Sequence, residues 1–279
     1  MVAWGLQGGA TLLECLLGLA LGLVVVAAVA VHHLATGQSS RLQAAQAQMT
    51  EDAQIGLELL RTELMMAGYA QPQRFILDAQ GRPRWQTALA GQPPLMACDK
   101  GFVEADTVDS VVCAANGLSA ALEVSYQADA FNTVPLSDNS TPTDCLGNGL
   151  KNPQLAPLTR NRWYVASSQG RSELRCASQL GNPGQPLVDN VEVLALWFSL
   201  AQAGSPMTPV RYVKASQVDS FSRVRSVRLC LLLRSTEAVL AAEDTLAYFD
   251  CEGTPQTSSD RRLRRSFHAV VALRAATGG

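Results

Sequence analysis

The chain has 279 residues, a formal net charge of −2, 47% hydrophobic residues and only 16% charged residues. This composition is too apolar for a disordered chain, and its charge is too low for a protein that binds nucleic acid through bulk positive charge. The length allows one large or two small folded units. A single stretch is long and apolar enough to cross a membrane, which excludes a multi-span membrane protein.

That stretch covers residues 12–31 and contains one charged residue, Glu14. About 20 residues of helix extend about 30 Å, which is enough to span a bilayer. A secretory signal peptide would have a basic start and a small-residue cleavage site after its apolar core. Here the small pair Gly8-Gly9 precedes the apolar run. Cleavage at this pair would leave the membrane helix on the mature protein.

Glu14 is a candidate functional residue because a carboxylate inside a membrane span is costly. Cleavage after Gly9 would make Ala10 the new N-terminus and Glu14 the fifth residue. A free α-amino group is cationic at neutral pH, so the N-terminus of one subunit could pair with Glu14 of a neighbour and offset the cost of burial. The alternative is a carboxylate that lies at the membrane edge without a role.

The sequence GATLLE from Gly9 to Glu14, followed by an apolar run, resembles the class III signal of type IV prepilins. The resemblance implies that residues 1–9 are a leader and that a prepilin peptidase cuts after Gly9. It also implies methylation of the new N-terminus, Ala10, and a subunit-docking role for Glu14. Two features depart from the family pattern. The first mature residue is Ala10 rather than Phe or Met, and the leader contains no Lys or Arg.

The helical pattern continues beyond the apolar run. Apolar residues recur at spacings of three or four as far as Ala67, which is typical of an amphipathic helix. No proline interrupts this stretch, and Gly68 is a suitable C-cap. The sequence therefore predicts one helix over residues 10–68, about 87 Å long. Within it, Gly18 and Gly22 form a G-x-x-x-G step that allows close helix packing or simply reflects the small-residue content of the run.

Three further elements resemble PilW-type minor pilins. The first is the Leu-Leu-x-x-Glu-Leu-x-x-Ala-Gly-Tyr ending at residues 59–69. The second is an Asp-Cys-x-Gly element at 144–147, followed by Asn-Arg-Trp at 161–163 and Leu-x-Cys at 174–176. The third is a C-terminal Arg-Arg-x-Phe…Val-x-Leu-Arg pattern that ends at Arg274. The fold expected is α+β and type IV pilin-like, with a long N-terminal helix packed on an antiparallel β-sheet domain.

Residues 69–279 are predicted to form this β-rich domain. Short helices are expected at 215–221 and 236–243. Long loops rich in Gly, Pro, Asn and Ser are expected at 81–97, 132–159 and 179–190. The expected strands are 108–114, 122–129, 162–168, 173–178, 191–201, 224–234 and 266–274.

The seven cysteines indicate disulfides rather than a metal or redox centre, because none forms a C-x-x-C pair. Cys15 lies in the apolar run, where a thiol behaves as a small hydrophobe. The other six lie downstream of a membrane-targeting segment and predict up to three bridges in an oxidising compartment. Of the many connectivities, the strand and loop spacing favours pairing in chain order, and the PilW resemblance supports the last two pairs more than the first. The pairs are Cys98–Cys113, Cys145–Cys176 and Cys230–Cys251.

A basic cluster near the C-terminus has two interpretations. Arg261, Arg262, Arg264 and Arg265 could contact DNA phosphates, as in pili that take up DNA. They could equally form a solvated turn before an edge strand, where charge blocks aggregation. We favour the structural interpretation because no aromatic residues are interleaved with the arginines.

The remaining polar motifs do not indicate catalysis. Asp138, Asn139 and Asp144 could supply oxygen ligands to calcium, but their spacing is not that of an EF-hand. The sequence has no G-x-S-x-G motif, no phosphate-binding loop and no conspicuous carboxylate pair. We therefore predict that the protein is not an enzyme and needs no cofactor or metal.

The function predicted is that of a minor pilin in type IV pilus assembly, held in the inner membrane by one span with its C-terminal domain in the periplasm until it enters the pilus. The resemblance implies a priming or tip complex with other minor and major pilins and a tip adhesin, after processing by prepilin peptidase. We do not expect nucleic acid to be a partner. The alternatives are a minor pseudopilin of a type II secretion system, a DNA-uptake pilin and, last, a cell-envelope enzyme.

Overall fold

The computed structural model describes residues 11–89, 91–108, 110–151, 157–168, 170–180, 183–202, 205–241 and 244–273. The predicted processing residues Gly9 and Ala10 lie outside the described residues, as does Arg274.

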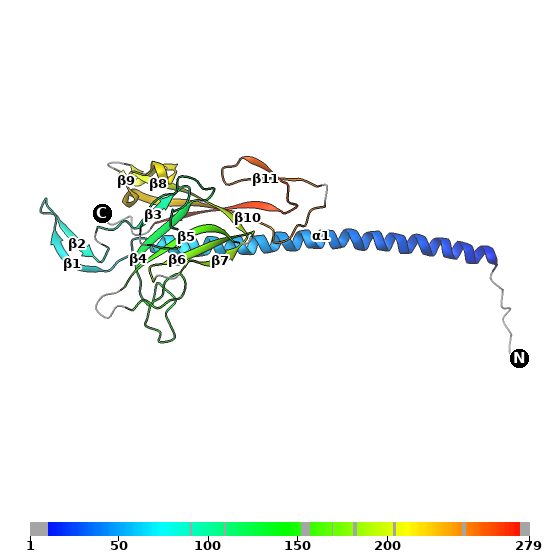
Figure 1. Cartoon of the computed structure of the whole chain (residues 1–279), viewed down its shortest axis with the longest axis horizontal. Coiled ribbons are helices and arrows are strands. Elements are labelled where there is room, and N and C mark those ends of the chain that lie inside the picture. The colour runs from blue at the N-terminus through cyan, green and yellow to red at the C-terminus, as the bar shows by residue number, and fades with distance from the viewer. Residues whose placement is uncertain are drawn as a thin grey trace.

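Helix α1 (Leu12–Met66) is one continuous 55-residue helix. It leaves the β domain as a long rod, so that the two halves of the helix have different surroundings (Figure 1). The helix stops at Ala67 and is followed by Gly68, whose φ of 76° lies in the left-handed region that favours glycine. The observed helix therefore begins and ends within two residues of the predicted one.

Two antiparallel sheets form the body of the β domain. The first has five strands in the order β3-β4-β5-β6-β7, and the second has four in the order β13-β10-β8-β9. Strands of both sheets contact the C-terminal half of α1. The strands of the first sheet are β3 (Leu95–Cys98), β4 (Ala121–Gln127), β5 (Leu158–Ser168), β6 (Arg171–Ser178) and β7 (Gln185–Asp189). Those of the second are β8 (Val191–Gln202), β9 (Ser205–Val213), β10 (Val224–Arg234) and β13 (Arg264–Ala272).

The core lies where the helix meets both sheets. Leu60 and Leu64 of the helix are fully buried among apolar side chains of the two sheets. Gly56 permits the closest approach. A Cβ atom at this position would stand 2.9 Å from Leu231 Cδ1 on β10 and 3.7 Å from Leu174 Cδ2 on β6. The amphipathic stripe of the sequence is thus buried in the seam between the sheets.

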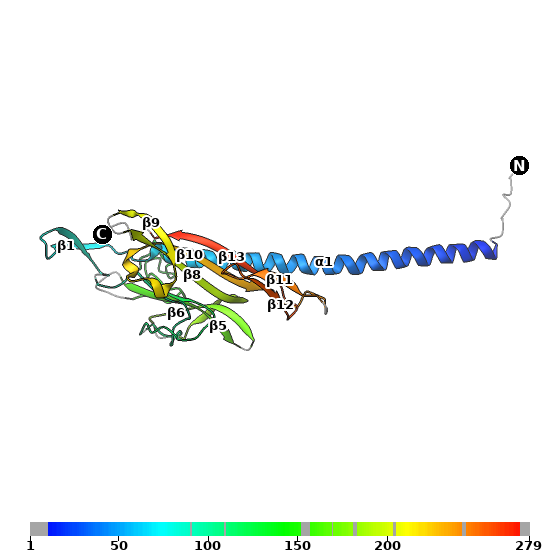
Figure 2. The ribbon, with the colours of Figure 1, turned by 90° about the horizontal axis from the view of Figure 1, so that it is seen from above.

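Two hairpins complete the domain. The hairpin of β1 (Pro72–Leu77) and β2 (Pro83–Thr87) projects from the end of the molecule that is far from the N-terminus (Figures 1 and 2). The hairpin of β11 (Leu246–Phe249) and β12 (Pro255–Ser258) lies near the second sheet, to which the Cys230–Cys251 disulfide ties it.

Some predicted elements were wrong. The segment 108–114 is not a strand in its described residues and takes part only in an isolated bridge between Phe102 and Cys113. The described residues of 236–243 form no helix, and the helix expected at 215–221 is replaced by two 3-10 turns, Ala215–Gln217 and Phe221–Arg223. Two of the predicted loops contain strands: β2 and most of β3 lie in 81–97, and β7 lies in 179–190. Strands β1, β9, β11 and β12 were also not predicted.

Candidate functional site

The N-terminal half of α1 is an uncovered apolar surface. Leu16 and Leu17 are each 55% exposed, and every residue from Leu12 to Val31 is exposed. The most apolar 18-residue window has a mean hydropathy of 2.6 and no buried residue, and α1 is the one helix among the described residues that could span a membrane by length and composition. An apolar surface of this size is unfavourable in water and is normally covered by lipid or by other helices. The helix is therefore consistent with a single-pass membrane anchor.

Glu14 caps its own helix. The backbone N–H of Thr11 donates to Glu14 Oε2 at 2.8 Å, and the backbone N–H of Glu14 donates to Thr11 Oγ1 at 3.3 Å. This reciprocal arrangement is a capping box, which satisfies two of the free N–H groups at a helix start. The structure thus places the carboxylate in the first turn of the exposed apolar half. Its docking role stays a prediction.

Gly18 and Gly22 lie one turn apart in the same exposed half. A Cβ atom at either position would meet no other atom within 4 Å. None of the described residues therefore packs closely against these glycines, and their packing role also stays a prediction.

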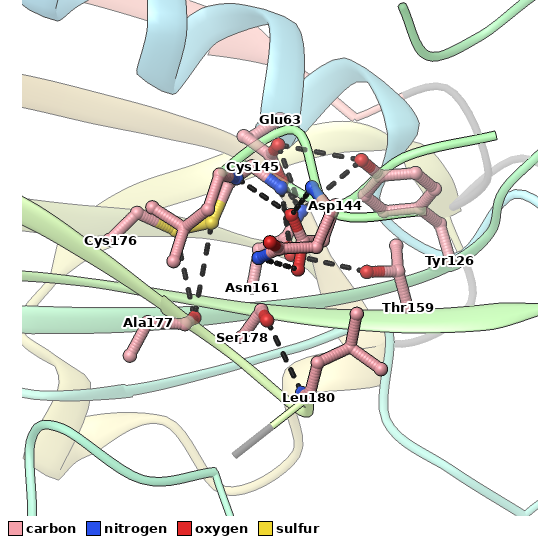
Figure 3. The surroundings of a disulfide bond; sticks show 12 residues. Glu63, Tyr126, Asp144, Cys145, Thr159, Asn161, Cys176, Ala177, Ser178 and Leu180 are labelled. Atoms are coloured by element: carbon pink, nitrogen blue, oxygen red, sulfur yellow. Dashed lines mark hydrogen bonds between the residues drawn. A yellow bond between two sulfur atoms is a disulfide. The ribbon is translucent and has the colours of Figure 1, made fainter. Parts of the chain in front are cut away.

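The C-terminal half of α1 carries a buried carboxyl group, Glu63, which is 8% exposed. Asn161 Nδ2 donates to both of its oxygens at 3.0 and 3.1 Å, and the Tyr126 hydroxyl donates at 3.4 Å (Figure 3). Asn161 Oδ1 in turn accepts from the hydroxyl of Thr159 at 3.1 Å and from the backbone N–H of Cys145 at 3.4 Å. One carboxyl group thus connects the helix to β4, to β5 and to the loop that holds Cys145.

The surroundings of Glu63 favour its neutral form. Burial raises the pKa of Glu63 to about 7, although the hydrogen bonds from Asn161 and Tyr126 act in the opposite direction. Burial also raises the pKa of Tyr126, which therefore stays a hydroxyl donor. Glu63 and Asn161 both lie within the PilW-like elements, but no feature of the sequence indicates that they are in contact. The one feature that could have indicated a buried carboxyl group is the position of Glu63 next to the apolar stripe of the helix.

All six cysteines downstream of the helix form disulfides, in the chain-order pairs. The bridges are Cys98–Cys113, Cys145–Cys176 and Cys230–Cys251, with Cα–Cα distances of 5.3, 6.5 and 5.7 Å. These distances are normal for disulfides. The second bridge lies directly beside the Glu63 and Asn161 contact (Figure 3). Cys15 is a free, exposed thiol in the apolar half of the helix.

Arg162 holds the loop closed by the first disulfide. Successive side chains of a strand point to opposite faces, so Asn161 faces the helix and Arg162 faces this loop. The Arg162 side chain is fully buried; its Nε and Nη2 donate to Glu123 Oε2 at 2.9 and 2.5 Å. Its guanidinium also donates to the carbonyls of Glu104, Thr107 and Ser110 and stacks 4.3 Å from the centre of the Phe102 ring. Asn161 thus attaches one face of the five-stranded sheet to the helix, and Arg162 attaches the other face to the loop between Cys98 and Cys113.

The basic cluster has structural partners. Arg264 forms ion pairs with Glu192 and Asp260, both at 2.7 Å. Arg262 donates to backbone carbonyls of Ser235 and Thr236, and Arg261 donates to that of Leu240. The hydrogen bonds from Arg264 hold the pKa of the Asp260 carboxyl far below its usual range. Three of the four arginines therefore donate hydrogen bonds within the fold. The guanidinium of the fourth, Arg265, lies 5.3 Å from the centre of the Phe267 ring, so all four have partners, as the structural interpretation requires.

The proposed calcium ligands serve as turn formers. Asp138 accepts hydrogen bonds from the backbone N–H groups of Ser140 and Thr141, and Asp144 accepts from those of Leu146 and Asn148. Within the part of the chain that the structure describes, no group of three or more His, Cys, Asp or Glu side chains is placed to hold a metal ion.

Comparison with known proteins places part of the chain in a family. A family model described as type IV pilus-assembly protein W, PilW, matches residues 162–275. No curated protein matches the sequence. Among solved structures, the type IV-like pilin TTHA1219 from Thermus thermophilus matches with a TM-score of 0.38 and 11% identity over 82% of this chain and 98% of the pilin. That likeness is low, and the assignment rests on the family match. Residues 162–275 of this chain are therefore similar to the type IV pilus-assembly protein W family, PilW.

Proposed function

We propose that this protein is a minor pilin that takes part in type IV pilus assembly, in a priming or tip complex with other minor pilins. The proposal is supported chiefly by the continuity of α1, which joins an exposed apolar segment to the β domain in one unbroken helix. The N-terminal half of α1 is apolar and wholly exposed, and its C-terminal half is buried in a domain that matches the PilW family. A subunit of this shape can pack its helix against other helices while the domain stays outside the membrane.

Assembly would begin with processing. Prepilin peptidase would cut after Gly9 and methylate Ala10, which leaves a cationic N-terminus directly before Thr11. Glu14 would then be available to the N-terminus of a neighbouring subunit, because its bonds to Thr11 are only local capping contacts. Gly18 and Gly22 would allow two helices to approach closely, which is what drives helix association in lipid. The protein would stay in the inner membrane until the pilus forms.

The test is cross-linking in cells that express the full chain with its native partners. A photoreactive residue at Leu17 should give adducts with other pilins, and Glu14→Gln should reduce the yield at least tenfold without changing the amount of the protein. Glu58→Gln is the matched control, since Glu58 lies on the same helix, is 65% exposed and pairs only with Arg61. Equal cross-linking in the two variants would contradict the docking role of Glu14.

The partners recovered also separate the two closest functions. Other minor pilins and a pilus adhesin among the adducts support the pilus assignment. Adducts with components of a type II secretion system, and none with pilus proteins, would instead identify a minor pseudopilin with the same helix chemistry.

A further inference from the structure

The junction between α1 and the five-stranded sheet is built around an acid without a basic partner. The charged and titratable groups that face Glu63 come from each element packed against it. Strand β4 contributes Tyr126, the Cys145 loop contributes Asp144, and the helix contributes Glu58, which is paired with Arg61. Strand β5 contributes only the neutral side chains of Thr159, Asn161 and Trp163. Among the described residues, no cation lies within ion-pair distance of Glu63.

Solvent can reach this junction. A cavity of about 370 Å³ lies between the helix and the Cys145 loop, lined by Ile55, Leu59, Glu63, Cys145 and Trp163. Trp163 also lines this cavity, and its buried Nε1–H group forms no hydrogen bond of normal geometry with the described residues. The cavity gives protons and water a path to the carboxyl group. It also means that ionised Glu63 has neutral donors on one side and a mostly apolar wall on the other.

The same junction supports the segment that follows the helix. The backbone N–H of Gly68 donates to the carbonyl of Ser125 at 2.9 Å, and that of Gln127 donates to the carbonyl of Tyr69 at 2.7 Å. The backbone N–H of Gln71 donates to Gln127 Oε1 at 2.7 Å, immediately before strand β1. The projecting hairpin β1–β2 is therefore attached to β4 next to the residue that bonds Glu63, Tyr126. A change in the junction would be transmitted to this hairpin.

We propose that proton binding at Glu63 sets how tightly the end of α1 is held against β4 and β5, so that the junction loosens as the carboxyl group ionises. In the closed junction the protonated carboxyl bridges the helix to Asn161 and Tyr126. Ionisation leaves a buried carboxylate near Asp144 with no compensating cation, which favours local opening into water. The exported domain thus carries a pH-sensitive contact between its helix and its sheet, independent of the membrane half.

The sign and size of the effect follow from the two protonation equilibria. The pKa of Glu63 is about 7 in the closed junction, against 4.5 for the solvated carboxyl. Below pH 4.5 both states hold the proton and pH has no effect, whereas between 4.5 and 7 opening releases a proton and becomes easier as pH rises. Above pH 7 the effect levels off. The equilibrium constant for opening should rise about tenfold between pH 6 and pH 8.

Amide hydrogen exchange of the full-length protein in detergent micelles tests this proposal. Exchange in residues 60–71 and 143–146 is followed at pH 6 and pH 8 and corrected for the intrinsic pH dependence of amide exchange. The wild type should show about a tenfold loss of protection, and so should the control Glu51→Gln, whose exposed side chain lies about three turns from Glu63 on the same helix. Glu63→Gln should change less than twofold. An equal pH effect in Glu63→Gln and the wild type, or no effect in the wild type, would overturn the proposal.

A second variant keeps the test decisive if Glu63→Gln fails to fold. Tyr126→Phe retains the ring but removes one hydrogen bond that favours the carboxylate. The pKa of Glu63 should therefore rise, and the pH midpoint of opening should move upward with it. The carboxyl carbon resonance of Glu63, followed by NMR across pH 4 to 9, reports the same midpoint directly. A midpoint near 4.5 in the wild type, or one that Tyr126→Phe leaves unchanged, would contradict the mechanism.

Discussion

Replacing Arg162 with methionine should cost the domain a large part of its stability. Arg162 is fully buried and its guanidinium serves Glu123 and three backbone carbonyls at once. Methionine fills a similar volume but donates no hydrogen bond. The substitution therefore leaves a carboxylate on a residue that is only 4% exposed without its cation, and it leaves the loop carbonyls without their donor.

The size of the loss can be worked out from these contacts. Breaking a buried ion pair by removing one partner costs about 3–5 kcal/mol, because the remaining charge is uncompensated. A typical domain has only about 5–15 kcal/mol of total stability. We therefore expect Arg162→Met to lower the free energy of unfolding by about 3–5 kcal/mol at pH 7. The loop between Cys98 and Cys113 should become sensitive to protease while its disulfide stays intact.

Urea unfolding followed by circular dichroism measures the loss, with two comparison variants. The double variant Arg162→Met/Glu123→Leu should recover at least 1 kcal/mol, because it removes the uncompensated charge. Arg160→Met is the matched control on the same face of the same strand, where the side chain is partly exposed, and it should change stability by less than about 0.5 kcal/mol. A loss below 1 kcal/mol in Arg162→Met, or a double variant less stable than the single one, would refute the reasoning.

Three further outcomes are expected. Replacing Cys145 and Cys176 together by serine should lower the free energy of unfolding by about 3 kcal/mol in urea unfolding, since the bridge closes a long loop; an unchanged midpoint would contradict this. Gly56→Leu should lower the free energy of unfolding by about 3 kcal/mol, because the new side chain would enter the space of Leu231. Gly37→Leu, where no atom lies near the Cβ position, should leave stability unchanged, and urea unfolding of both variants checks the difference. In a gel-shift assay, neither the wild type nor the double variant Arg261→Gln/Arg265→Gln should bind DNA above background. Salt-sensitive binding by the wild type that the double variant loses would instead support a DNA-uptake role.

Much of the fold could be predicted because its signals are periodic. The long helix has an apolar stripe and a glycine stop, and the central strands β8 and β10 are apolar enough to be recognised. The hairpin β1–β2 lacks this signal, since its described side chains are mostly exposed and do not alternate between core and solvent. The segment 108–114 has the composition of a strand, but Arg162 and the first disulfide hold this region as a loop.

The candidate site was only partly predictable. Glu14, the glycine pair and the cysteines carry local sequence signals, whereas the contact between Glu63 and Asn161 joins residues 98 positions apart. No spacing rule identifies such a pair in one sequence, because the contact depends on how the helix crosses the sheet. Asn161 and Arg162 point to opposite faces of β5, but their partners could be named only after the structure showed that the helix covers one face and the Cys98–Cys113 loop covers the other.

Whether the protein is a processed pilin is decided by the intact mass and N-terminal sequence of the protein extracted from membranes, with and without prepilin peptidase. We expect a mature chain that begins at N-methylated Ala10 when the peptidase is present and an unprocessed chain when it is absent. An unprocessed Met1 start in peptidase-competent cells would show that the protein is not processed as a pilin. Glu14 would then lie far from any free N-terminus, and the long helix would be only an anchor for the β domain.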